Sequence, residues 1–290
     1  MFKGSLVAIV TPFKNGRVDE RALGDLIEFQ IANGTDGIVP CGTSGESATL
    51  TYEEHDRVIE FTVEATKRRV PVIAGTGSNS TDEAITLTKH AKQAGADGAL
   101  LICPYYNKPT QEGLYRHYKA IAEAVDLPLI VYNIPGRTSV NILPATIARL
   151  SSIRNVVAIK EGAGSLGQVS EIIQACGDRI TVLAGDDPLT LPMMAVGAQG
   201  VITVTANIAP ADMAALVDAF AAGRLDQAKA LHYKLYPLFT ALFYETNPIP
   251  VKEALGMMGK IQPELRLPLC PMSAENRDKL ARAMKDYGLI

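Results

Sequence analysis

Short apolar runs recur along the chain, and each is followed by a stretch with the periodicity of an amphipathic helix. The runs are rich in β-branched residues and apolar throughout, which is typical of parallel strands covered by helices on both faces. They begin about 30 residues apart and later about 20 apart, the length of one strand–helix unit. The predicted strands are Leu6–Val10, Gly37–Val39, Val70–Ala74, Ala99–Ile102, Leu127–Val131, Val156–Ile159, Ile180–Leu183 and Val201–Val204.

Eight such units predict an α/β fold, a (β/α)8 TIM barrel that carries the active site over residues 1–224. The competing fold is an open doubly wound sheet, which usually has a G-x-G-x-x-G turn after its first strand. Here that turn reads Thr11-Pro12-Phe13-Lys14-Asn15-Gly16. Helical spacing around 228–243 and 279–283 predicts that residues 225–290 form a C-terminal helical extension packed on the barrel. No linker divides the chain, so we expect a single domain overall.

Composition and charge exclude several classes of protein. The chain has 290 residues, 47% of them hydrophobic and 20% charged, which argues against disorder. Its net charge is −3 and its longest basic run is Lys67-Arg68-Arg69, so we expect no nucleic-acid partner. No apolar segment approaches the ~20 residues that span a bilayer. The first apolar run stops at Thr11-Pro12, too early for a signal peptide, and the four cysteines are far apart, so we expect a cytoplasmic protein.

Lys160 is the sharpest candidate for chemistry, because catalytic residues of these barrels follow the C-terminal ends of strands. It comes directly after the apolar run Val156–Ile159. An ammonium group among apolar neighbours loses hydration, so its pKa falls and the amine becomes a nucleophile for a carbonyl. The alternative is a lysine that reaches the barrel rim and pairs with Glu161 or Asp187.

Hydroxyl and guanidinium groups follow other strands. Tyr132, Tyr106 and Thr43 near a desolvated lysine would form a hydroxyl chain able to move protons. Alternatively, each tyrosine is an amphipathic core residue with its hydroxyl at the surface. Arg137, on a loop with Pro135, is suited to bidentate capture of a carboxylate, although a solvated loop arginine remains the alternative.

Metal catalysis has little support in the sequence. All four histidines (His55, His90, His117 and His232) fall in helical stretches, where we expect them to face solvent. Asp186 and Asp187 have no third carboxylate at another strand end, so we predict no metal site. The same acidic pair argues against a phosphate site after the seventh strand.

Several short motifs carry a resemblance to a known family. Gly42-Thr43-Ser44-Gly45-Glu46, Tyr132-Asn133-x-Pro135 and Ile159-Lys160-Glu161 are typical of pyruvate-dependent class I lyases, a superfamily that includes N-acetylneuraminate lyase. The continuation Gly136-Arg137-Thr138, together with Gly185-Asp186-Asp187 and the segment 200–207, is more specific. The chain resembles the dihydrodipicolinate synthase family along nearly its whole length, from Gly4 to Lys252.

The resemblance implies condensation of pyruvate with aspartate semialdehyde and no cofactor, since pyruvate forms a Schiff base on Lys160. Tyr132, Thr43 and Tyr106 match the family's proton relay, with Tyr106 supplied by a neighbouring subunit. The family is commonly a homotetramer, a dimer of tight dimers. The residues implied to bind the substrates are Thr43, Ser44, Arg137, Gly185 and Ile202.

The resemblance also implies a regulatory site for L-lysine, the end product of the pathway. Tyr52 stands where some lysine-sensitive bacterial members have histidine. On composition alone these positions are ordinary polar residues of loops and helix starts. The matching positions are Ser47, Ala48, Tyr52, His55, Asn79, Glu83 and Tyr105.

Two other functions compete with this one. A lyase for N-acetylneuraminate or a 2-keto-3-deoxy sugar acid would use Lys160 and Tyr132 in the same roles. Arg137 favours the synthase, because a charged side chain suits a short substrate that ends in a carboxylate. A non-catalytic barrel that only binds a keto or amino acid would be expected to have lost Lys160 or one of the hydroxyls, and all are present.

Overall fold

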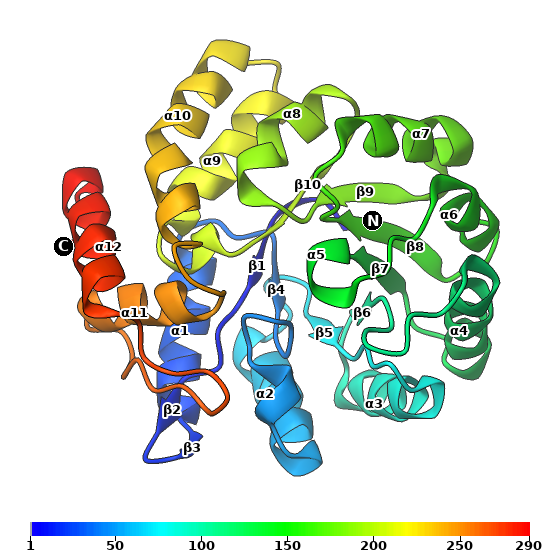
Figure 1. Cartoon of the computed structure of the whole chain (residues 1–290), viewed down its shortest axis with the longest axis horizontal. Coiled ribbons are helices and arrows are strands. Elements are labelled where there is room, and N and C mark those ends of the chain that lie inside the picture. Colours follow the sequence, from blue (N-terminus) through cyan, green and yellow to red (C-terminus); the bar gives the residue numbers. More distant parts are fainter. Residues whose placement is uncertain (1) are drawn as a thin grey trace.

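A computed structural model describes residues 2–290 and shows a parallel barrel wrapped by helices (Figure 1). Its eight strands are hydrogen-bonded in the order β4-β1-β10-β9-β8-β7-β6-β5. The predicted barrel is therefore confirmed, with strand bounds that differ by up to three residues. The barrel strands are β1 (Gly4–Ala8), β4 (Gly37–Val39), β5 (Ile73–Gly75), β6 (Gly98–Ile102), β7 (Leu129–Asn133), β8 (Val156–Glu161), β9 (Thr181–Ala184) and β10 (Gly200–Thr203).

The last seam of the barrel lies between β4 and β5, which pair only briefly. Ile38 forms a parallel bridge with Val72, and its N–H donates to the carbonyl of Pro71 at 2.9 Å. At the other end of the seam, Gly75 donates to the carbonyl of Pro40 at 2.9 Å. These contacts bring the two ends of the sheet together, so the sheet nearly closes on itself.

A helix follows every barrel strand, and local sequence fixes several of the starts. Thr51 and Glu54 form a reciprocal capping box at the start of α2. Pro144 and Pro210 begin α6 and α9, at the first helical position, where the missing backbone N–H of proline has no partner to lose. The helices around the barrel are α1 (Glu20–Ala32), α2 (Tyr52–Thr66), α3 (Thr81–Ala94), α4 (Gln111–Ala124), α5 (Pro135–Thr138), α6 (Pro144–Leu150), α7 (Leu166–Cys176), α8 (Thr190–Ala195) and α9 (Pro210–Ala221). Short 3-10 turns occupy Ser47–Thr49 (η1), Gly177–Arg179 (η2), Asp187–Leu189 (η3) and Thr205–Asn207 (η4).

Side chains alternate between the barrel interior and the helix layer, because successive residues of a strand point to opposite faces. The interior holds a small apolar cluster that includes Ile130, Tyr132 and Ala158, whereas Val131 and Ile159 belong to the larger cluster under the helices. Lys160 lies two residues after Ala158 on β8, so its side chain points to the same interior as that of Tyr132.

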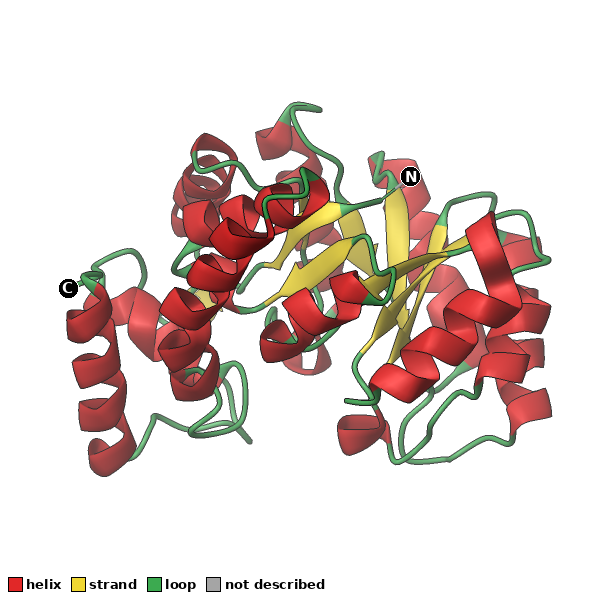
Figure 2. Ribbon diagram, turned by 90° about the horizontal axis from the view of Figure 1, so that it is seen from above, coloured by secondary structure: helices red, strands yellow, loops and turns green. Residues whose placement is uncertain are grey.

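The tail folds as three helices beside the barrel (Figure 2). They are α10 (Leu225–Ala241), α11 (Ile249–Met257) and α12 (Ala274–Tyr287). The first packs on α9, and the last packs on α10 and α11 at the outer edge of the molecule, as Figure 1 also shows. Within residues 2–290, no helix is both long and apolar enough to cross a membrane.

The structure contains one element that the sequence does not predict, and it shows one expectation about local structure to be wrong. The turn after the first strand contains a hairpin, β2 (Phe13–Lys14) with β3 (Arg17–Val18), which is too short to leave a periodic signal. The histidines do not all face solvent. His55, His117 and His232 are buried, because they lie on helix faces that pack against neighbours, and only His90 is half-exposed.

Candidate active site

Lys160 lies in a cavity of about 200 Å³ at the C-terminal end of the barrel. Its neighbours around this cavity include Ala8, Leu100 and Tyr132, which come from three different strands. The residue is only 5% exposed, and its Nζ lies 4.2 Å from the centre of the Tyr132 ring. Tyr132 and Lys160 are register partners on neighbouring strands, so their proximity follows directly from the pairing of β7 with β8.

Burial lowers the pKa of Lys160 to about 8, and Arg137 acts in the same direction while Asp187 opposes it. At pH 7 roughly a tenth of the amine is therefore unprotonated, the state that attacks a carbonyl carbon. The alternative of a rim ion pair finds no support, because no described carboxylate lies within ion-pair distance of this ammonium group.

The two carboxylates considered as partners for Lys160 are bound elsewhere. Glu161 accepts from the Asn133 amide at 3.0 Å and from the backbone N–H of Ala163 at 2.6 Å. Asp187 accepts from the hydroxyl of Thr205 at 2.6 Å and from its backbone N–H at 2.7 Å. Burial raises the pKa of both carboxyl groups. Asp187 therefore anchors the turn after β10 through one oxygen, Oδ2, which accepts both bonds from Thr205.

Hydroxyl groups stand beside the lysine. Tyr132 and Thr43 both line the cavity, and neither hydroxyl has a hydrogen-bond partner among residues 2–290. Burial raises the pKa of Tyr132 to about 12, so its phenol remains protonated at neutral pH and is available as a proton donor. Tyr106, the third predicted member, is 90% exposed and does not line the cavity of its own chain.

Arg137 lines the same cavity. It comes from the short helix α5 and donates to the carbonyl of Asn247 at 3.1 Å. Asn247 also donates from its amide to the hydroxyl of Ser44 at 3.1 Å. The sequence analysis assigns Asn247 no role at the site, because its local sequence does not indicate which loop it contacts.

Of the two remaining residues predicted to bind substrate, one lines the cavity and the other does not. Gly185 lines the cavity at the end of β9. Ile202 lies deeper, in the apolar cluster inside the barrel, and its residue is not part of the cavity wall.

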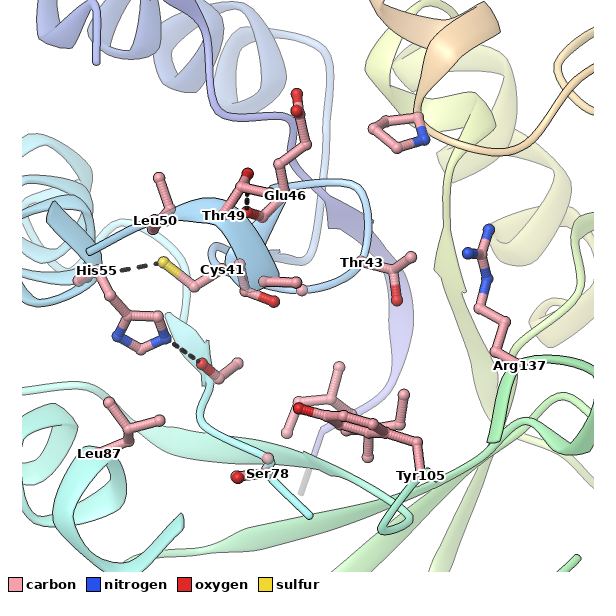
Figure 3. A pocket seen from close by; sticks show the side chains of 18 of the residues that line it. Cys41, Thr43, Glu46, Thr49, Leu50, His55, Ser78, Leu87, Tyr105 and Arg137 are labelled. Atoms are coloured by element: carbon pink, nitrogen blue, oxygen red, sulfur yellow. Dashed lines mark hydrogen bonds between the residues drawn. The ribbon is translucent and has the colours of Figure 1, made fainter. Parts of the chain in front are cut away.

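A second, larger cavity of about 750 Å³ adjoins the first, and both are lined by Thr43, Tyr132, Arg137 and Asn247. Figure 3 shows Thr43 and Arg137 on one side of it and Cys41 and His55 on the other. Most positions predicted for L-lysine line this cavity: Ser47, Ala48, Tyr52, His55, Glu83 and Tyr105. Asn79 is not in its wall, but its amide donates to the carbonyl of Tyr105 at 3.2 Å.

The polar groups of the larger cavity are already connected to one another. The Tyr52 hydroxyl donates to Glu83 at 2.5 Å, and the Ser78 hydroxyl donates to the same carboxylate. The bond from Ser78 lowers the pKa of Glu83, so the carboxylate stays ionised. His55 is within 2.9 Å of the Gly75 carbonyl through Nε2, and burial lowers its pKa. The wall of the cavity thus includes the ionised Glu83 and a neutral imidazole, beside Glu46, Glu53 and Arg137.

Comparison with known proteins agrees with these features. A family model described as the dihydrodipicolinate synthetase family matches residues 1–287. A curated 4-hydroxy-tetrahydrodipicolinate synthase of Syntrophus aciditrophicus is 65% identical over 290 residues, which is the whole of both chains.

Solved structures give the same result. The dihydrodipicolinate synthase of Aquifex aeolicus is 54% identical, covers 99% of each chain and has a TM-score of 0.98. A chloride-inhibited synthase from Acinetobacter baumannii, complexed with pyruvate, is 51% identical over 100% of each chain, also with a TM-score of 0.98. The enzyme of Cyanidioschyzon merolae, with lysine bound, is 40% identical, covers 100% of this chain and 99% of its own, and has a TM-score of 0.96. With this match across the whole barrel and its tail, the chain belongs to the dihydrodipicolinate synthetase family.

Proposed function

We propose that the protein is a 4-hydroxy-tetrahydrodipicolinate synthase that condenses pyruvate with L-aspartate 4-semialdehyde. The observation that carries the proposal is the buried Lys160, with a pKa near 8, in contact with the Tyr132 ring in a small cavity bordered by Arg137. The pyruvate complex of the related Acinetobacter baumannii enzyme supports pyruvate as the first substrate.

In the proposed mechanism, the Lys160 amine attacks the ketone carbon of pyruvate and water leaves, giving a protonated imine. The imine withdraws electrons, so the methyl group loses a proton and an enamine forms. The enamine carbon adds to the aldehyde carbon of the semialdehyde, and the substrate's own amine then attacks the imine carbon and expels Lys160. The protonated imine serves as the electron sink, so the chemistry needs neither a metal nor an organic cofactor.

Tyr132 and Thr43 relay protons in this scheme, and Tyr106 joins them from a second subunit. The 90% exposure of Tyr106 supports a role across a subunit interface, in a dimer or a tetramer built of two dimers. Thr43 and Ser44 bind the pyruvate carboxylate, Gly185 lines the pocket, and Arg137 binds the semialdehyde's carboxylate. A reaction of this kind is the first committed step of diaminopimelate and L-lysine synthesis, and we propose that the protein carries it out in the cytoplasm.

Turnover of pyruvate with aspartate semialdehyde tests the proposal, followed through reduction of the product by the next enzyme of the pathway. N-acetylneuraminate and 2-keto-3-deoxygluconate are assayed in parallel for cleavage to pyruvate. The synthase assignment would be overturned if borohydride trapped the pyruvate adduct but the protein cleaved a sugar acid and did not use the semialdehyde.

The pH dependence of imine formation follows from the pKa of Lys160. Below a pKa of about 8 the reactive amine is a minority, so the trapping rate at low pyruvate should rise about tenfold per pH unit and level off above pH 8. The rate is measured by intact mass after borohydride quenching at intervals. A midpoint near 10.5, the ordinary value for lysine, would contradict the burial argument.

L-Lysine is proposed to inhibit by binding in the larger cavity, with its ammonium group on Glu83; the lysine-bound relative supports this ligand. Glu83→Gln removes the charge and should raise the inhibitory lysine concentration at least about tenfold, because a charge-assisted hydrogen bond is lost. Inhibition curves and calorimetric titration measure the effect. Asp82→Asn, on the exposed face of the same helix, is the matched control and should leave inhibition unchanged.

A further inference from the structure

A buried ion pair links the tail to the loop that carries Thr43 and Ser44. Lys252 of α11 is completely buried, and its Nζ donates to Glu46 at 2.5 Å and to the carbonyl of Thr11 at 3.0 Å. Glu46 is 4% exposed. Its other carboxylate oxygen accepts the backbone N–H of Arg266 at 3.2 Å. Both oxygens of Glu46 are therefore held by residues of the tail.

The loop from Cys41 to Glu46 has a backbone that needs such support. Cys41 and Glu46, at its two ends, have φ values of 54° and 51°, in the left-handed region that side chains disfavour. Inside the loop, Gly45 accepts the Thr11 hydroxyl at 2.7 Å, and a Cβ on Gly45 would meet the Cys41 nitrogen at 3.0 Å. A conformation of this kind persists only where surrounding contacts fix it.

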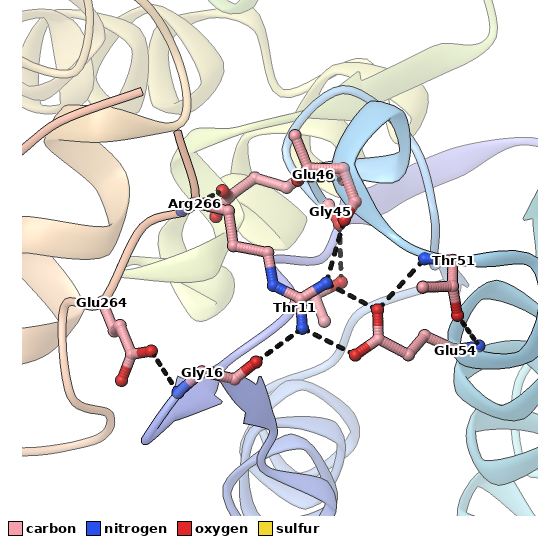
Figure 4. Close-up of polar contacts among 9 residues, drawn as sticks. Thr11, Gly16, Gly45, Glu46, Thr51, Glu54, Glu264 and Arg266 are labelled. Carbon is pink, nitrogen blue, oxygen red and sulfur yellow. Dashed lines mark hydrogen bonds and ion pairs between the residues drawn. The ribbon is translucent and has the colours of Figure 1, made fainter. Parts of the chain in front are cut away.

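Arg266 ties the same region to the start of α2. Its guanidinium donates to both oxygens of Glu54, at 2.5 and 2.6 Å, and to the carbonyl of Gly16 at 2.8 Å. Figure 4 shows Arg266 between the β2–β3 hairpin and the helix, with Glu46 and Gly45 above it. The tail thus contacts the loop itself at Glu46 and contacts the helix that follows the loop at Glu54.

Thr43 is the loop residue through which these contacts affect the substrate. Its hydroxyl borders the Lys160 cavity and has no hydrogen-bond partner within residues 2–290. Where its oxygen lies is therefore decided by the loop backbone. On the proposed function, this oxygen and the neighbouring N–H groups receive the pyruvate carboxylate, so an error of about 1 Å in the loop would misplace the ketone relative to Lys160.

We infer that Glu46 and Lys252 are positioning residues for pyruvate: the ion pair fixes the strained loop so that Thr43 and Ser44 meet the carboxylate of the first substrate. The inference rests on the proposed function. Neither residue lines the cavity beside Lys160, so their effect passes through the loop. Arg137, which serves the second substrate, donates to the Asn247 carbonyl and contacts neither member of the pair through a hydrogen bond.

Lys252→Met tests the inference, because it removes the charge and keeps nearly the length of the side chain. Glu46→Gln is a second variant, which keeps the shape of the other partner and removes its charge. KM for each substrate and kcat are measured well below the melting temperature of each variant. Pyruvate KM should rise about tenfold or more, and half-saturation of borohydride trapping should shift equally, while KM for the semialdehyde changes less than about threefold.

Tyr287→Phe is the control, since it removes a tail-to-barrel hydrogen bond to Asp212 that does not reach the loop. It should leave pyruvate KM unchanged even if it lowers the melting temperature. A folded Lys252→Met or Glu46→Gln whose pyruvate KM stays within twofold of wild type would overturn the inference, as would an equal rise in Tyr287→Phe. Failure of the wild type to form any pyruvate adduct would instead refute the proposed function.

Discussion

Replacing Lys160 by alanine should lower turnover by at least about 10⁴-fold and abolish the pyruvate adduct that borohydride traps in the wild type, because the covalent route is lost. The remaining pocket would still bind pyruvate, so the loss appears in kcat and not as a change in KM alone. Coupled turnover and intact mass measure the two effects. Lys229→Ala, an exposed lysine of α10, is the control and should behave as wild type.

Lys160 lowers the stability of the folded protein although it is needed for turnover, so its replacement should raise the free energy of unfolding. Burial disfavours the charged form of Lys160, so its pKa is lower in the folded chain than in the unfolded chain. The unfolded state therefore binds more protons between pH 8 and 10.5, and the free energy of unfolding should rise with pH across this window. Lys160→Met removes the buried charge and should stabilise the protein at pH 7 by on the order of 1–3 kcal/mol. A denaturant titration at pH 7 and pH 10 checks both statements, and a variant less stable than wild type would contradict them.

Tyr132→Phe should lower kcat by about 10²- to 10³-fold, the usual contribution of a positioned proton donor. The imine itself should still form, since Lys160 is unchanged. Slow turnover with normal final trapping is therefore the expected signature. It separates a role in proton transfer from a role in holding the lysine.

Tyr118→Phe is the matched control for that experiment. Tyr118 is also fully buried, but its hydroxyl donates to the carbonyl of Leu101 at 3.2 Å, on the helix side of the barrel. Removing this hydroxyl should reduce stability slightly and leave kcat within about twofold, because only a hydrogen bond of ordinary strength is lost. Equal losses of kcat in the two variants would show that Tyr132 acts through packing.

The barrel could be predicted from sequence because its signal is local and repeated. A run such as Val156–Ile159 is apolar throughout, which indicates a strand covered on both faces. A helical pattern follows each such run, so the strand–helix unit can be recognised eight times. The hairpin at Phe13–Val18 could not be predicted, since two-residue strands have no measurable period. The sequence also predicts a solvent-facing His117, but its Nδ1 lies 2.9 Å from the hydroxyl of Thr81 on the preceding helix, α3. The periodicity of a single helix does not contain such a contact.

The site could be predicted in the part that depends on strand ends. Tyr132 and Lys160 could be predicted because catalytic residues of such barrels lie at the C-terminal ends of the strands. The structure pairs these two residues in register on neighbouring strands. Asn247, Lys252 and Arg266 could not be assigned in this way. They reach the site from the tail, across more than 100 residues of sequence, and nothing in their local pattern says which loop they meet.

The origin of these three contacts has a consequence for the order of synthesis. All eight strands have been made once Thr203 is added, yet a nascent chain of that length would leave Glu46 without the cation that neutralises it and the pocket without its Asn247 wall. At ~5–20 residues per second the ribosome needs several more seconds to supply them. On the proposed function, the substrate loop therefore gains its full set of contacts only after the chain has been made as far as Arg266 and the tail has packed on the barrel.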